Sequence, residues 1–132
     1  MSAVAQDLEQ FLVSAQSRIH DELHDFLRIP SVSANSEHTP DVRRAAEWVA
    51  AQCTAIGLTT VEVIDTPGHP IVLAKWLGAP GKPTVLIYGH YDVQPPEPLE
   101  LWTSPAFEPT VRDGKLFARV AASTTRGSCS CT

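Results

Sequence analysis

The sequence of 132 residues has little cysteine, little positive charge and no long apolar stretch. Ten lysines and arginines against fifteen aspartates and glutamates give a net charge of -5 without a basic stripe, which argues against nucleic-acid binding. No apolar run reaches the roughly 18 residues of a membrane helix, and the polar, acidic start does not look like a secretory signal. We therefore expect a cytoplasmic protein with no membrane partner.

The three cysteines form an odd number and are unevenly placed along the chain. Cys129 and Cys131 lie close to its end, so neither a disulfide framework nor a thiolate zinc site is predicted. Cys53 is expected to be a buried, small apolar residue. The sequence also lacks the Gly-x-Ser-x-Gly motif of α/β hydrolases, which disfavours a serine or cysteine nucleophile.

The first half of the chain has the spacing of two helices. Apolar residues recur at three- and four-residue steps from Val4 to Leu27, the period of an amphipathic helix, and Pro30 marks the end of that region. A second helix is predicted from an N-cap at Asp41 to a stop at Gly57. Three strands are then predicted at residues 59–64, 71–77 and 84–88, the last two as a hairpin.

The segment that follows is rich in proline and ends in a second turn signal. Prolines between Gln94 and Pro109 predict a surface loop, and Asp113-Gly114 predicts the turn of a final hairpin. Trp102 and Phe107 are expected to pack this loop, although contact with a substrate is the other interpretation. Helices followed by a mixed β-sheet predict an α/β layered domain.

Residues 85–95, VLIYGHYDVQP, read as an apolar strand that ends in His90-x-Asp92. Side chains two apart on an extended chain point to the same face, so both can approach one spot beyond the strand. A neutral imidazole can ligate zinc, and a nearby carboxylate can hold the imidazole of a metal-bound histidine. The motif alone also permits a structural interpretation, in which His90 is hydrogen-bonded and Asp92 caps a turn.

The other histidines give weaker signals. His20 and His24 lie four apart on the first predicted helix and could share a metal, but no third ligand is evident, so we interpret them as a solvated helix face. His38 and His69 lie in turn-rich segments, and we expect no catalytic part for either.

The sequence around His90 and Asp92 resembles the M20 family of metallopeptidases, in particular its carnosine-dipeptidase-like branch. The resemblance is specific from Tyr88 to Arg119 and looser upstream, at RIPSVS (28–33) and RAAEW (44–48). It implies that residues 1–119 are the N-terminal portion of a zinc-exopeptidase-like catalytic domain. It also implies a two-zinc hydrolase that cleaves dipeptides or small amides by a metal-activated water. A homodimer is a further expectation for the full-length protein.

By this resemblance His90 corresponds to the first zinc ligand and Asp92 to the catalytic carboxylate that holds that histidine. Manganese or cobalt would also suit His-x-Asp. The family further requires a bridging aspartate in a Gly-Ala-Ser-Asp-Asp-Lys-Gly segment, a Glu-Glu pair, another carboxylate and a last histidine, none of which occurs in these 132 residues. The chain itself is therefore expected to be inactive. The alternative function is a non-catalytic fragment or a partner-binding module.

Where the bridging aspartate is expected, residues 120–132 read VAASTTRGSCSCT. Codons GAC GAC AAG GGG CAG CTG TTC ATG CAC encode Asp-Asp-Lys-Gly-Gln-Leu-Phe-Met-His, a family-like segment. Loss of their first G gives a reading that translates as Thr-Thr-Arg-Gly-Ser-Cys-Ser-Cys-Thr, the sequence of residues 124–132. We interpret residues 120–132 as an aberrant, disordered tail, in which residues 124–132 are a shifted reading of the family motif. A genuine low-complexity terminus is the alternative.

Overall fold

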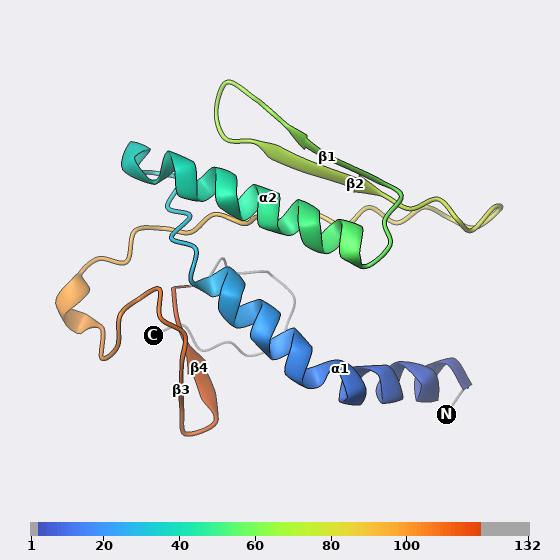
Figure 1. Ribbon diagram of the computed structural model, residues 1–132, viewed down its shortest axis with the longest axis horizontal. Helices are drawn as coiled ribbons and strands as arrows, with labels where there is room; N and C mark the ends of the chain where they lie inside the picture. Colours follow the sequence, from blue (N-terminus) through green and yellow to red (C-terminus); the bar gives the residue numbers. More distant parts are fainter. Residues whose placement is uncertain (1–2, 120–132) are drawn as a thin grey trace.

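The computed structural model describes residues 3–119, so the tail expected at residues 120–132 lies outside the described part (Figure 1). Two helices precede all the strands, which confirms the predicted order. The elements are α1 (Ala3–Leu27), η1 (Ser36–His38), α2 (Thr39–Ala55), β1 (Thr60–Ile64), β2 (Ile71–Lys75), η2 (Leu99–Leu101), β3 (Thr110–Arg112) and β4 (Lys115–Phe117). None of the described helices has both the length and the apolar character to cross a membrane.

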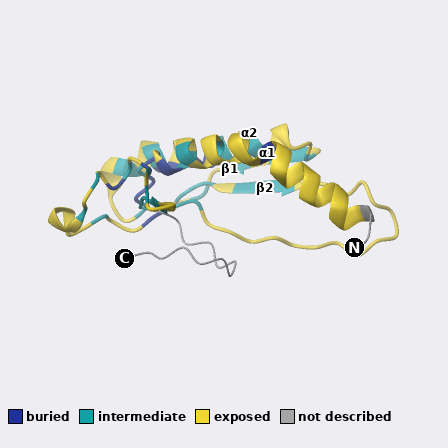
Figure 2. Ribbon diagram, turned by 90° about the horizontal axis from the view of Figure 1, so that it is seen from below, coloured by how far each residue is buried: buried dark blue, intermediate teal, exposed yellow. Residues whose placement is uncertain are grey.

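Helix α1 is one continuous helix, as the periodicity predicted, but most of its apolar stripe is on the surface. Leu8 and Phe11 are 57% and 54% exposed, whereas only Ala15 and Leu27 are buried among residues 4–27. Figure 2 shows this exposure along the helix. The C-terminal end is anchored by Phe26, whose ring stacks on Trp48 of α2 at a centroid distance of 4.8 Å. The helix is therefore fixed at one end.

Helix α2 begins earlier than predicted, and Asp41 is not its N-cap. The 3-10 turn of η1 runs directly into the helix, with His38 at the N-cap position and Pro40 in the first turn, where a missing N–H costs nothing. Asp41 instead lies inside the first turn and accepts hydrogen bonds from His38 Nδ1 at 2.8 Å and from Arg44 at 2.9 Å. The helix ends before Gly57, whose φ of 90° confirms the predicted stop.

The buried apolar side chains lie on α2, which contacts one β-hairpin, and at Ala15, Leu27, Ile29, Val32, Val93 and Ala106. Val42, Ala45 and Ala46 on α2 are fully buried, and this helix lies against the hairpin (Figure 2). Strands β1 and β2 are antiparallel, with Thr60 opposite Lys75 and Ile64 opposite Ile71. Small side chains on the helix allow a close approach to the sheet. Cys53, expected to be buried, is only half-buried.

The strand predicted at residues 84–88 does not form, and β2 pairs with β1 instead. Leu86, Ile87 and Tyr88 are 89–90% exposed, and the extended connection after β2 passes below the hairpin without pairing to it (Figure 2). A strand needs a neighbour to satisfy its backbone N–H and C=O groups, and the described residues supply none here. The expected mixed sheet is thus two antiparallel pairs, β1–β2 and β3–β4, with one parallel bridge between Val32 and Val93.

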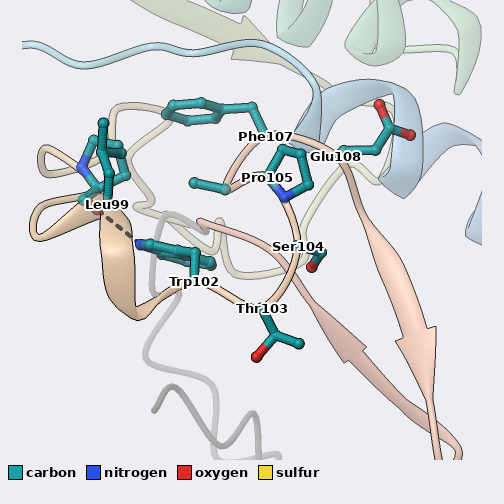
Figure 3. A pocket seen from close by; sticks show the side chains of 9 residues that line it. Leu99, Trp102, Thr103, Ser104, Pro105, Phe107 and Glu108 are labelled. Atoms are coloured by element: carbon teal, nitrogen blue, oxygen red, sulfur yellow. Dashed lines mark hydrogen bonds between the residues drawn. The ribbon is translucent and has the colours of Figure 1, made fainter.

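The last part of the described chain follows the prediction more closely. Asp113 and Gly114 have φ angles of 50° and 71°, as the tight turn between β3 and β4 requires. Residues 94–109 form the predicted loop, which contains the short 3-10 helix η2. Trp102 and Phe107 are half-buried and line an open hollow of about 710 Å³ in this loop, where Trp102 Nε1 donates to the Pro96 carbonyl at 2.7 Å (Figure 3). These contacts support the packing interpretation.

A matched pair of valine truncations tests where the stability lies. We expect Val42→Ala to lower the free energy of unfolding by about 2 kcal/mol, because it removes buried methyl groups and leaves a cavity. Val4→Ala, at a side chain that is 76% exposed, should change it by less than about 0.5 kcal/mol. Urea denaturation followed by circular dichroism measures both. Equal losses in the two variants would contradict the proposed core.

Candidate functional site

The His90-x-Asp92 segment is attached to the chain that follows α1. The Val93 N–H donates to the Ser31 carbonyl at 3.0 Å, and Val32 and Val93 form the parallel bridge. The Ser31 hydroxyl donates to the Tyr91 carbonyl at 2.7 Å. Ser31 and Val32 are each 2% exposed and Val93 is 7% exposed, so this pairing is shielded from water. It fixes the backbone on which the motif stands.

A third segment, the end of the turn between β1 and β2, joins this junction. His69 Nε2 donates to the Ser33 carbonyl at 3.0 Å, and the Tyr91 hydroxyl donates to the Pro70 carbonyl. Both contacts use side chains on one segment and carbonyl groups on another. Residues 31–33, 69–70 and 91–93 are therefore held together by directional bonds.

His90 and Asp92 point at each other, so the predicted convergence of the two side chains is confirmed. His90 Nδ1 lies 3.0 Å from Asp92 Oδ1 and 3.1 Å from the Asp92 carbonyl oxygen. Because both neighbours are acceptors, Nδ1 carries the proton. Nε2 has no hydrogen-bond partner among residues 3–119, and in the neutral ring its lone pair is free for a ligand.

Asp92 is held by a second donor as well. The Ser33 hydroxyl donates to Asp92 Oδ2 at 2.5 Å. Partial burial by itself raises the pKa of the Asp92 carboxyl, but the hydrogen bonds from Ser33 and His90 together outweigh it and lower the pKa below its usual value. Burial, with the nearby charge of Asp92, raises the pKa of Tyr91. Asp92 is thus a carboxylate at neutral pH, and Tyr91 is a neutral phenol.

The described residues offer one metal ligand at this place rather than a complete set. The imidazole of His90 fits a divalent metal, because its Nδ1 is engaged and its side chain is 45% exposed. Within residues 3–119, no group of three or more His, Cys, Asp or Glu side chains could hold a metal ion. His38 pairs with Asp41 at the start of α2 and His69 with the Ser33 carbonyl, and neither belongs to a group of three such side chains within residues 3–119.

Ser33 is the residue of the site that sequence reasoning missed. It lies 59 positions before Asp92, and no spacing rule connects the two. RIPSVS (28–33) belongs to the family resemblance, but nothing in those letters shows which serine faces the carboxylate. Ser31 and Ser33 bond the same short segment, one to a backbone carbonyl and the other to a side chain. Only the folded chain separates their roles.

Comparison with known proteins shows which sequences and structures this chain resembles. Residues 86–129 match the model of peptidase family M20/M25/M40. The chain is 44% identical over 85 residues to the succinyl-diaminopimelate desuccinylase of Thiobacillus denitrificans, covering 64% of this chain and 21% of that protein. It is 38% identical over 103 residues to the Cys-Gly metallodipeptidase dug1 of Schizosaccharomyces pombe, covering 70% and 22%.

Solved structures agree with the sequence relatives. Human carnosine dipeptidase 1 superposes with a TM-score of 0.81 at 26% identity, over 89% of this chain and 27% of that one. The dipeptidase Dug1p from Saccharomyces cerevisiae gives 0.77 at 26% identity, over 85% and 26%. The chain spans about a quarter of the length of these relatives. The chain thus matches peptidase family M20/M25/M40 over residues 86–129 and is similar in sequence and fold to the dipeptidases named above over most of its length.

Proposed function

We propose that residues 1–119 are the N-terminal portion of the catalytic domain of a metal-dependent hydrolase that cleaves dipeptides. His90 supplies Nε2 to a zinc ion, and Asp92 holds the imidazole from the other side. The observation that carries this proposal is the paired contact of His90 Nδ1 with Asp92, which leaves the opposite ring nitrogen free. A metal ion held there, one of two in the complete site, would polarise the substrate carbonyl and activate water.

Dipeptides are the preferred substrate class, because the dipeptidases match most of the chain in both comparisons. A second candidate is hydrolysis of an N-succinyl amide, favoured by the 44% identity to a desuccinylase. Both reactions break an amide bond. Manganese or cobalt in place of zinc, a homodimeric full-length protein and a cytoplasmic location belong to the same proposal.

The 132 residues alone are proposed to be inactive. One imidazole is too little ligation to retain a catalytic metal, since zinc sites use three or four protein ligands. A non-catalytic fragment or partner-binding module remains the alternative function for this chain. Hydrolysis by the 132-residue chain itself would overturn the proposal of inactivity.

The proposed activity is tested on the longer protein that a corrected reading frame would encode. With Zn²⁺ present we expect hydrolysis of Cys-Gly, and His90→Ala should lower kcat/KM by on the order of 10³-fold because a metal ligand is lost. Asp92→Asn should lower zinc affinity by about 10- to 100-fold. Rates from ninhydrin detection of released amino acids, with zinc measured by mass spectrometry, provide the readouts.

His38→Ala is the matched control, because His38 also bonds a carboxylate, Asp41, but stands at the start of α2. It should leave kcat/KM within about threefold. Activity on N-succinyl-diaminopimelate without activity on Cys-Gly would select the second candidate. Full activity of His90→Ala would refute the metal role of this residue.

The proposed origin of residues 124–132 has a direct test in the coding DNA. Sequencing from the Arg119 codon onward should show that one nucleotide added before the Thr124 codon restores Asp-Asp-Lys-Gly and an open frame. The physical reason is that a two-metal site needs a carboxylate between its ions, and the tail as read contains none. A downstream sequence with no such motif in any frame would instead support a genuine low-complexity terminus.

A further inference from the structure

The two oxygens of the Asp92 carboxylate have different partners from distant parts of the chain. Oδ1 faces His90 Nδ1 at 3.0 Å, and Oδ2 accepts from the Ser33 hydroxyl at 2.5 Å. A carboxylate that accepts on one oxygen only can rotate about its Cβ–Cγ bond. With a donor on each oxygen, the plane of the Asp92 group is fixed.

Ser33 is itself held in place independently of Asp92. Its carbonyl accepts from His69 Nε2 at 3.0 Å, and the preceding Val32 forms the shielded bridge to Val93. The backbone at Ser33 is thus held by contacts that do not involve the Asp92 side chain. The Ser33 hydroxyl can therefore orient the Asp92 carboxylate.

We propose that Ser33 is a positioning residue, which orients Asp92 so that His90 keeps its proton on Nδ1 and presents the lone pair of Nε2 to a metal ion. The inference rests on the proposed function only where it names a metal ion as the ligand of Nε2. The orientation of the imidazole by Ser33 and Asp92 does not depend on the proposed function. The chain of contacts is Ser33 Oγ to Asp92 Oδ2, then Asp92 Oδ1 to His90 Nδ1.

Ser31 provides a matched control within the same three residues. Its hydroxyl also crosses to the His90-x-Asp92 segment, donating at 2.7 Å, but to the Tyr91 backbone carbonyl. Ser31→Ala therefore removes one bond between the same two segments and leaves the Asp92 carboxylate untouched. A general loosening of the junction would affect both serine variants alike, whereas positioning through Asp92 affects only Ser33.

The test is the tautomer of His90 in the 132-residue chain labelled with ¹⁵N-histidine. Two-bond ¹H–¹⁵N spectra at about pH 8.5, well above the ordinary imidazole pKa of about 6.5, distinguish a protonated Nδ1 from a protonated Nε2. We expect the Nδ1–H form in the unmodified chain, in Ser31→Ala and in Ser33→Thr, which keeps the hydroxyl. Ser33→Ala should give a mixture of tautomers.

A second pair of variants guards against a fold defect in Ser33→Ala. Ser33→Thr and Ser33→Val have the same shape and differ only in the hydroxyl, so their comparison isolates the hydrogen bond. The Val variant should lose the fixed tautomer and bind Zn²⁺ about tenfold more weakly than the Thr variant. An unchanged Nδ1–H tautomer in Ser33→Ala and Ser33→Val, or an equal loss in Ser31→Ala, would overturn the proposal.

Zinc addition separates this inference from the proposed function. In the unmodified chain, ZnCl₂ should shift the His90 Nε2 resonance. If Zn²⁺ leaves that resonance unchanged while the tautomers follow the expected order, the metal role of His90 fails and the positioning by Ser33 stands. If Zn²⁺ shifts it and the tautomer is insensitive to the Ser33 hydroxyl, the positioning role fails alone.

Discussion

The short pairing between residues 31–33 and 91–93 is the constraint on which the site depends. It is made of a backbone hydrogen bond, a serine-to-carbonyl bond and the bridge of Val32 with Val93, all shielded from solvent. Because it lies directly beside the motif, it holds the backbone of the three-residue His-x-Asp motif in place. The turn after β1 adds His69 and Pro70 to the same junction, so three segments of the chain meet there.

The polarity of the contacts at this junction explains the state of each side chain. A carboxylate with two donors stays ionised, and a histidine facing two acceptors keeps its proton on the facing nitrogen. His38 and Asp41 form a similar histidine–carboxylate pair in the described residues. This pair lies at the start of α2, where its role is structural. Location, rather than residue type, distinguishes a structural pair from a candidate site.

Two apolar surfaces have no partner among residues 3–119. One is the stripe along the first half of α1, and the other is the segment 84–88, whose backbone is unpaired and whose side chains are almost fully exposed. Exposed apolar segments with free edges favour association. In the described part, the buried apolar side chains lie elsewhere, on α2 and at positions such as Leu27, Ile29, Val32 and Val93, so these two surfaces contribute little to stability. The chain spans about a quarter of its relatives' length.

The sequence by itself determined the features that rest on neighbouring residues: the extent of α1, the stop at Gly57, the turn at Asp113-Gly114 and the convergence of His90 with Asp92. Each follows from local backbone preferences or a two-residue period. Tertiary structure alone decided which strands pair and which serine reaches the carboxylate, because those contacts join positions far apart in the chain. The apolar run at 84–88 was therefore predicted as a strand although its pairing depends on a neighbour, and Ser33 was not predicted at all.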